Sequence, residues 1–444
     1  MCPYVLMKRQ FCLTILFGAA LLPADCARGA ESFGATNAPA SDPVLLHALI
    51  AEALEKNPEL KFYEAEIAAA RAQAKNSGRF AAPEVEASVG QKSARDDANR
   101  FRGEGAAWSV ALKQPIEWPG RLGLRKAIAN RDVALAELGL ARFRSALAAK
   151  VRAAAHDLAV AQQRVAASRA VAERLRELRE TLVARDPAGL TPLLETRVIE
   201  ASEIKAEHTA AEAEHDVEHL AIELNYLRGQ SPTIPLRVAE TPLQFGAGPT
   251  LADLYAAAAT NNFELRLRVA ELEQQGFKVS LARNERFPAF SIGPMISEER
   301  ANDRERIIGV GISLPLPLWQ NNRAKVDVAE ARRAQAEAVL ESSRRQVERD
   351  VADYAHKYEH ALGVLAKSRP DAIQHFREAA ELADRHYRLG AVPVSTYVEL
   401  QRQYVEAVEA LLDARKEALA AAHQLEFLSG LPLPLVSATK EAKP

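Results

Sequence analysis

The sequence predicts a mainly α-helical protein with a membrane-embedded β-sheet portion, built as two copies of one unit. Three observations predict it: helices longer than those of globular domains, short segments of alternating apolar and polar residues, and the return of the same element order about 200 residues later. The 444-residue chain has a formal net charge of −2, so it lacks the basic footprint of a nucleic-acid-binding protein.

The first long helix is expected over 121–186. Apolar or small residues recur from Leu147 to Val165 in steps of 4, 3, 4, 3 and 4, the 3.5-residue period of a coiled-coil seam. No glycine or proline interrupts the chain between Gly139 and Pro187. Such a helix is roughly 96 Å long, whereas helices of globular domains average about 11 residues.

The N-terminal segment 1–29 is expected to be a signal peptide, followed by a flexible arm over 30–43. Lys8 and Arg9 precede an apolar run of about 12 residues, which is too short to span a bilayer as a helix. All three cysteines precede residue 30, so no disulfide framework or thiolate metal site is expected after it. Cys26 lies in a partial match to a lipoprotein box, and its lipidation stays an open alternative.

The first unit is expected over 44–229 and begins with a helix that Asn57-Pro58 interrupts. Its next expected elements are the strands 83–91 and 106–114 and the helices 121–186 and 193–229. Apolar and polar residues alternate in both strand segments, which is typical of a strand with one apolar face. A proline-rich linker is expected over 230–249.

The second unit is expected over 250–430, and the tail 431–444 is expected to be unstructured. Residues 262–265 (NFEL) take the place of residues 57–60 (NPEL) of the first unit, 205 positions earlier. After the first helix, the expected elements are the strands 289–297 and 306–314 and the helices 323–389 and 393–428. Pro370 should kink the long helix, because a proline inside a helix costs about 3 kcal/mol.

The four strands have the length that a tilted strand needs to cross an outer membrane. In lipid, an open sheet edge leaves backbone groups unpaired at several kcal/mol each, and closed bacterial barrels have at least about 8 strands. One chain therefore cannot close a barrel, and we expect several copies to share one. No apolar run after Leu22 is long enough for a membrane-spanning helix.

Two motifs stand out in this pattern. Gln114–Arg121 (QPIEWPGR) leads into the first long helix, and Arg388–Gly390 (RLG) precedes Thr396–Leu400 (TYVEL). The whole-chain pattern and these motifs resemble the TolC-like outer-membrane efflux family. The resemblance implies a homotrimer, with a 12-stranded barrel that continues into an α-helical tunnel.

The resemblance also implies a place and partners. The chain would lie in the outer membrane of a Gram-negative bacterium, in contact with its lipid and with a large periplasmic portion. It would be a passive exit duct in a tripartite pump, with a periplasmic adaptor (membrane fusion) protein and an inner-membrane resistance–nodulation–division pump as partners.

The first motif is most similar to the heavy-metal resistance branch, which implies export of metal cations. Export of drugs or of type I secreted polypeptides is the alternative within the same class. A soluble periplasmic coiled-coil scaffold is the alternative from another class, and the alternating strands disfavour it. No enzymatic activity and no cofactor are expected, because the sequence has no phosphate loop, Gly-x-Ser-x-Gly or His-Glu-x-x-His motif.

The turns after the long helices are candidate adaptor-docking tips by resemblance, although any helical hairpin also needs glycine or proline to reverse. The candidate tip residues are Gly189, Leu190, Pro192, Leu389, Gly390, Val392 and Pro393. Glu195 and Glu399 follow the turns and are candidates for an acidic tunnel aperture, which would favour cations. The alternative for both is a solvated helix face.

Three tryptophans lie in or next to the strands and are candidates for an aromatic belt at the membrane interface, with strand packing as the alternative. They are Trp108, Trp118 and Trp319, of which the last two would mark the periplasmic boundary. His215 and His219 are four residues apart and are weak candidates for a metal site. Because such groups on an exposed helix are usually solvated, no metal site is expected.

Overall fold

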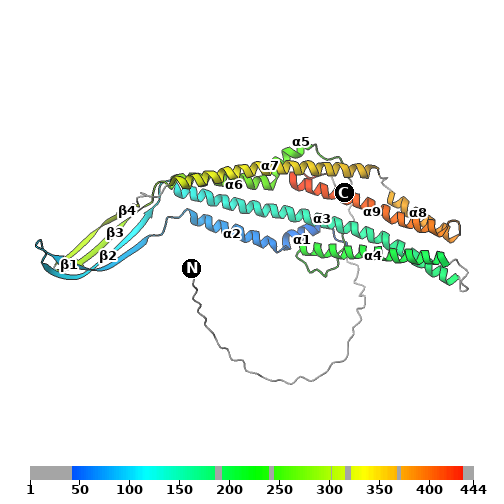
Figure 1. Ribbon diagram of the computed structural model, residues 1–444, viewed down its shortest axis with the longest axis horizontal. Coiled ribbons are helices and arrows are strands. Elements are labelled where there is room, and N and C mark those ends of the chain that lie inside the picture. Colours follow the sequence, from blue (N-terminus) through cyan, green and yellow to red (C-terminus); the bar gives the residue numbers. More distant parts are fainter. Residues whose placement is uncertain are drawn as a thin grey trace, which may run out of the picture. The chain divides into compact units, whose positions relative to one another are not determined.

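The computed structural model of the chain is mainly helical, with one small antiparallel sheet (Figure 1). It describes residues 43–185, 193–239, 245–301, 303–315, 322–367 and 372–433. The expected signal peptide, most of the N-terminal arm and residues 434–444 of the tail lie outside the described residues. In the described part of the chain, no helix combines the length and the apolar character that crossing a membrane requires.

The two units repeat one order of helices and strands. The first unit contains α1 Leu46–Lys56, α2 Glu59–Ser77, β1 Glu84–Arg95, β2 Phe101–Ile116, α3 Arg121–Arg185 and α4 Leu193–Leu227. The second contains α5 Leu251–Asn261, α6 Phe263–Asn284, β3 Phe290–Arg300, β4 Arg304–Ser313, α7 Asn322–Lys367, α8 Ala372–Arg388 and α9 Val394–Ser429. The helix predicted over 323–389 is described as α7 and α8, and Pro370 lies between them, outside the described residues.

The strands extend beyond the predicted ranges. The segments 83–91 and 106–114 were predicted to flank a loop, but β1 reaches Arg95 and β2 already begins at Phe101. On the other hairpin, predicted over 289–297 and 306–314, β3 reaches Arg300 and β4 begins at Arg304. Charged residues continue the strands here because their side chains stay exposed or form ion pairs while the backbone ladder goes on.

An asparagine sits at the break between the first two helices of each unit. Asn57 and Asn262 are both 4% exposed. The Nδ2 atom of Asn57 donates to the carbonyl oxygen of Leu227 at 2.9 Å, and that of Asn262 donates to Leu428 at 3.0 Å. Each Oδ1 accepts the backbone N–H two residues later, at 2.9 and 3.0 Å. The repeated motif thus ties the first helices of each unit to its last helix.

The two long helices differ in how much of their surface is covered. α3 packs against α2 and α4 of its own unit and against α6 and α9 of the second unit. α7 packs against α5, α6 and α9, and no described helix of the first unit covers its other flank extensively. Equivalent apolar cores form in the two units around Leu49, Val151 and Leu224 and around Leu254, Val351 and Leu425.

Candidate functional site

The two hairpins form one continuous sheet in the order β1-β2-β3-β4 (Figure 1). All neighbouring strands are antiparallel, and β2 of the first unit pairs with β3 of the second. The register places Trp108 opposite Val89 on one side and Glu298 on the other. β1 and β4 are the edges, and among the described residues no further strand pairs with either of them.

One face of the sheet is apolar over most of its length. The residues that the register places on it are Val85, Ala87, Val89, Trp108, Val110, Leu112, Ile292, Pro294, Ile296, Ile308, Val310 and Ile312. The two edges of this face are the most exposed, with Val89 at 87% and Ile308 at 74%. A continuous exposed apolar face of this kind marks contact with another protein or with a membrane.

The opposite face carries small and polar side chains. Ser88 and Ser109 share a hydrogen bond of 2.7 Å between their hydroxyls. Lys92 on β1 forms ion pairs with Glu299 on β3 at 2.8 Å and with Glu305 on β4 at 3.1 Å. Because two strands separate β1 from β4, the second contact shows that the sheet curls toward this face. The polar face is therefore concave and the apolar face convex.

Two of the three candidate tryptophans are described, and Trp319 lies outside the described residues. Trp108 is 37% exposed on the apolar face. Trp118 stacks on Phe287 with ring centroids 4.8 Å apart, where β2 leads into α3. Beside it, the buried guanidinium of Arg121 donates to the carbonyl oxygen of Phe287 at 2.6 Å. The motif before the long helix thus fastens the first unit to the start of the second hairpin.

The turn between α8 and α9 presents a rigid apolar tip. Gly390 has φ +74°, the left-handed conformation that favours glycine. Its N–H donates to the carbonyl oxygen of Tyr387 at 2.9 Å, and that of Ala391 donates to His386 at 2.9 Å. These two bonds form a Schellman motif, which ends α8 and leaves Leu389 80% exposed.

Only part of the predicted tip surface can be placed. The turn after α8 brings together Leu389, Gly390, Val392 and Pro393. The other predicted tip residues, Gly189, Leu190 and Pro192, lie outside the described residues.

A buried core below this turn was not predicted from the sequence. Tyr397 of α9 is fully buried and stacks on Tyr387 of α8 with ring centroids 5.2 Å apart. Gln401 is 1% exposed and donates to the carbonyl oxygen of Ala380 at 2.9 Å. Burial raises the pKa of the Tyr397 phenol. Burial, and then the charge of Glu195 on α4, raise the pKa of Tyr387.

The second aperture candidate, Glu399, has its own counter-ion. Arg402 donates to its Oε1 at 2.6 Å, and Gln403 donates to the same carboxylate at 2.8 Å. These hydrogen bonds hold the pKa of Glu399 below its usual value. Arg402 also contacts Glu406 at 3.2 Å. This part of α9 therefore presents alternating charges rather than a row of free carboxylates.

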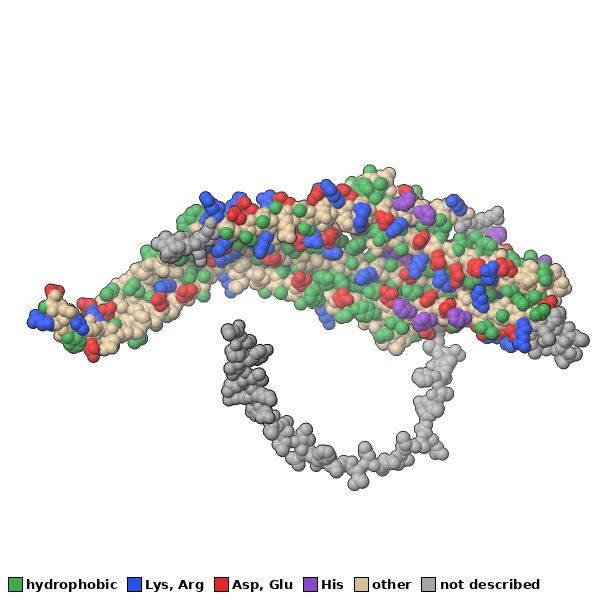
Figure 2. All heavy atoms as spheres, viewed as in Figure 1, with side chains coloured by type: hydrophobic (Ala, Val, Ile, Leu, Met, Phe, Trp, Pro, Cys, Tyr) green, Lys and Arg blue, Asp and Glu red, His purple; other side chains and the backbone are tan. Residues whose placement is uncertain are grey.

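The weak metal candidates His215 and His219 are exposed on α4. Histidine side chains are visible on the surface of the helices in Figure 2. Over the described ranges, no group of three or more His, Cys, Asp and Glu side chains is placed to hold a metal ion. A different histidine pair, His156 and His423, is buried between α3 and α9. Its members belong to different units, so no local spacing in the sequence indicated it.

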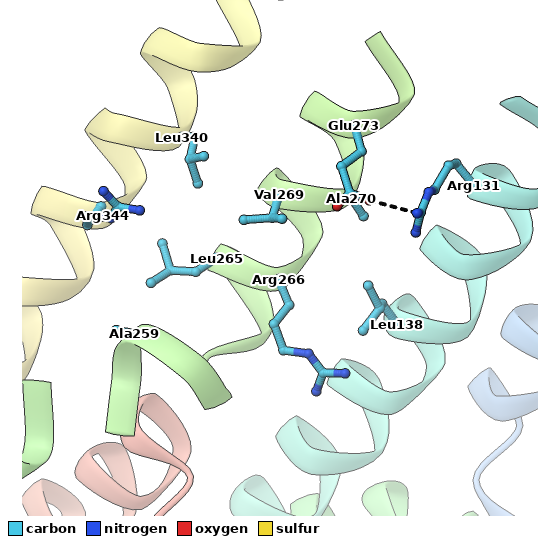
Figure 3. Close-up of a pocket in the computed structure, with 10 residues that line it drawn as sticks. All are labelled: Arg131, Leu138, Ala259, Leu265, Arg266, Val269, Ala270, Glu273, Leu340 and Arg344. Atoms are coloured by element: carbon cyan, nitrogen blue, oxygen red, sulfur yellow. Dashed lines mark ion pairs between the residues drawn. The ribbon is translucent and has the colours of Figure 1, made fainter. Parts of the chain in front are cut away.

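A cavity of about 290 Å³ lies where α3, α6 and α7 meet (Figure 3). Arg131 of α3 and Glu273 of α6 form an ion pair of 3.1 Å at its edge. Arg266 and Arg344 line it from α6 and α7, among leucine and valine side chains. The lining combines basic and apolar groups without a nucleophile–base pair. The cavity lies between the two units, and its lining residues form no catalytic arrangement.

Comparison with known proteins agrees with this fold. The family model described as "Outer membrane efflux protein" matches residues 254–431. No curated protein shows significant sequence similarity to the chain. A membrane protein from Pseudomonas aeruginosa is 22% identical, with 87% of this chain and 90% of that chain covered and a TM-score of 0.71.

Two outer-membrane channels give similar values. CmeC of Campylobacter jejuni is 15% identical, with 87% and 85% coverage and a TM-score of 0.69. MtrE of Neisseria gonorrhoeae is 19% identical, with 87% and 89% coverage and a TM-score of 0.66. At these identities the similarity shows the fold, a mainly helical chain with a small antiparallel sheet as in TolC-like channel structures. CmeC and MtrE are channels.

Proposed function

We propose that the chain is the outer-membrane exit channel of a tripartite efflux system. The observation that carries the proposal is the sheet, with its apolar convex face, its polar concave face and two edges that no described strand covers. This is the arrangement of a barrel segment with lipid outside and water inside. α3, with 65 residues or roughly 98 Å, continues from the sheet as the wall of a periplasmic tunnel.

The channel is a homotrimer. Three copies of the sheet supply about 12 strands, enough for a closed barrel, whereas four strands leave edges that lipid cannot satisfy. β1 and β4 run in opposite directions, so β4 of one copy can pair with β1 of the next in the same antiparallel sense. The flank of α7 that the first unit leaves uncovered would receive α2 and α4 of the next copy.

The helical end of the channel docks a periplasmic adaptor, which links it to an inner-membrane pump of the resistance–nodulation–division type. Leu389 supports this part of the proposal, because a rigid turn presents it at 80% exposure. A preformed apolar anchor loses little conformational entropy on binding. Glu195 and Glu399 lie next to this end and line the aperture, with Arg402 moderating the charge of Glu399.

The exported substrates are metal cations. The motif before α3 supports this, and so does the concave face, on which acidic side chains outnumber basic ones. The acidic residues there are Glu84, Glu86, Glu299 and Glu305, and the basic ones are Lys92 and Lys113. A narrow path lined with excess carboxylates favours cations. A deletion strain should therefore lose tolerance to zinc, cobalt, nickel or copper, whereas loss of drug tolerance alone would favour the drug-export alternative.

Purification tests the channel itself. The protein should require detergent for extraction, have the mass of three copies, show a hollow stalk in projection images and conduct ions across a planar bilayer. Recovery from the periplasm as a water-soluble single copy would favour the scaffold alternative and overturn the proposal.

A further inference from the structure

At the end of the sheet that carries the strand turns, the apolar convex face gives way to charge. Along β3 this face runs through Ile296 to Glu298 and Arg300, and β4 returns through Arg304 and Arg306 before the next apolar residue. Figure 2 shows charged side chains gathered at the end of the sheet farthest from the helices. The change from apolar to charged is thus abrupt and lies on the face proposed to meet lipid.

Three arginines enclose one carboxylate there. Glu298 is 3% exposed. Its Oε1 accepts a hydrogen bond from Arg300 at 2.9 Å, and its Oε2 accepts from Arg304 at 2.8 Å and from Arg306 at 3.0 Å. The three arginine side chains stay 61%, 55% and 52% exposed. We call Glu298 with these three residues the arginine cluster.

The arginine cluster has a net charge of +2, from three arginines against one glutamate. The neighbouring carboxylates of Glu299 and Glu305 do not offset it, because they lie on the concave face and pair with Lys92. Each guanidinium has five N–H donors and uses only part of them on Glu298. The cluster therefore presents unused, oriented donors toward the convex side.

The neighbouring residue Trp108 indicates how deep in the membrane the arginine cluster lies. The register places Trp108 directly opposite Glu298 on the same face. Tryptophan is enriched where acyl chains meet headgroups, and arginine on a lipid-facing strand is tolerated at the interface but costs about 2–4 kcal/mol at the midplane. Both residue types therefore indicate headgroup depth for this end of the sheet.

We propose that the arginine cluster binds phosphate groups of the outer-leaflet lipids that surround the barrel. Planar guanidinium groups bind phosphate oxygens in a bidentate manner, and Glu298 holds the three groups side by side for this. The inference rests on the proposed function, since it needs the convex face to lie in the membrane. It adds a specific lipid contact that the barrel fold alone does not require.

The test measures how much phosphorylated glycolipid the purified trimer retains and binds. The probes are lipid A, the same lipid after removal of its phosphates, and inorganic phosphate. Replacing only the three arginines would leave the buried carboxylate of Glu298 without its ion-pair partners. The main variant is therefore the quadruple E298Q/R300Q/R304Q/R306Q. The matched control replaces three exposed, ion-paired arginines of α7, in R333Q/R345Q/R349Q. Trimer mass is measured first for every protein.

The wild type and the α7 control should bind lipid A at least tenfold more tightly than the quadruple variant, and lipid without phosphates should bind all proteins equally weakly. E298Q alone should bind lipid A more weakly than the wild type but more tightly than the quadruple variant, because it keeps the three arginines and removes the carboxylate that holds them side by side. Inorganic phosphate should not displace the lipid.

Three results would overturn the inference. They are equal lipid A binding by the wild-type and quadruple trimers, equal binding of lipid with and without phosphates, and displacement by inorganic phosphate. Each of them leaves the channel proposal intact, because the trimers are shown to form. A wild-type protein that is a soluble single copy would overturn both.

Discussion

The imidazole rings of His156 and His423 stack with their centroids 5.3 Å apart, one on α3 and the other on α9. Both are more than nine-tenths buried, so this contact lies inside the joint between the two units. The charged groups that interact with this pair are Arg152, Asp157 and Glu426, and Asp157 in turn interacts with Lys416 and Glu223. Burial, and then the charges of His423 and Arg152, lower the pKa of His156 from 6.5 to about 4.

We therefore expect the stability of the protein to fall as the pH is lowered from 6.5 to about 4. In this range the unfolded chain binds a proton at His156 that the folded chain does not bind, so acid favours unfolding. The full loss is about 3 kcal/mol. Thermal unfolding of the detergent-solubilised protein across this range measures it, and His156→Phe should flatten the pH dependence.

The control for this prediction is His360→Gln, since His360 is exposed on α7 and its removal should leave the pH dependence unchanged. Burial raises the pKa of Asp157, which acts in the opposite direction by favouring the folded chain in acid. The difference between wild type and His156→Phe isolates the histidine. An unchanged pH dependence in His156→Phe would contradict the prediction.

The second prediction concerns the close approach of β2 and β3. A Cβ atom at Gly293 would lie 1.6 Å from the carbonyl oxygen of Leu112. Gly293→Ala should therefore force the strands apart, cost about 3 kcal/mol or more and sharply lower the yield of assembled protein in outer membranes. Gly309→Ala is the control, because a Cβ atom there meets nothing within 4 Å. Native gels of membrane extracts measure the yield, and equal yields for the two variants would refute the prediction.

The tip makes a third prediction. Leu389→Asp should weaken binding of the cognate adaptor about tenfold or more, because it replaces an apolar anchor with a charge. Assembly and unfolding temperature should not change, since this side chain is 80% exposed. Leu382→Asp, 48% exposed on the same helix, should have little effect. Binding of the purified adaptor to the two trimers measures the difference, and equal affinities would show that adaptors dock elsewhere.

The paired asparagines make a fourth prediction. Asn57→Ala and Asn262→Ala should each destabilise the chain by about 1–3 kcal/mol, because each leaves buried backbone groups unsatisfied. Asn130→Ala, at an exposed position of α3, should be neutral or slightly stabilising. Denaturant unfolding of the three variants measures the differences. Similar midpoints for all three would mean that the asparagine contacts contribute no net stability.

Much of the architecture could be predicted because it is local. The seam from Leu147 to Val165 is a pattern within a single helix, so residue order alone shows it. The repeated asparagine motif is also visible in the sequence, although its hydrogen bonds are not. The strands were predicted too short, because the residues around Lys92 and Arg304 are charged like a loop. In the sheet these charges pair across strands, which residue order does not show.

The features missed from the sequence all depend on packing between distant segments. In the sequence, Gln401 resembles any other polar residue of a helix, yet it is buried between α8 and α9. Glu298 and its three arginines lie within a short charged stretch, and only the strand register shows that they share one face. The pairing of β2 with β3 likewise joins two strands that lie far apart in the sequence, in different units.

In the proposed trimer, the flank of α7 that no described helix of the first unit covers extensively would make the contact between copies directional, since each copy would offer one surface and receive a different one. A copy with an altered α7 flank but intact α2 and α4 could still join a growing assembly at one end. It would stop growth there, because nothing could add behind it. If such a variant were produced together with the normal protein, the fraction of channels that it disables would exceed its fraction of the chains.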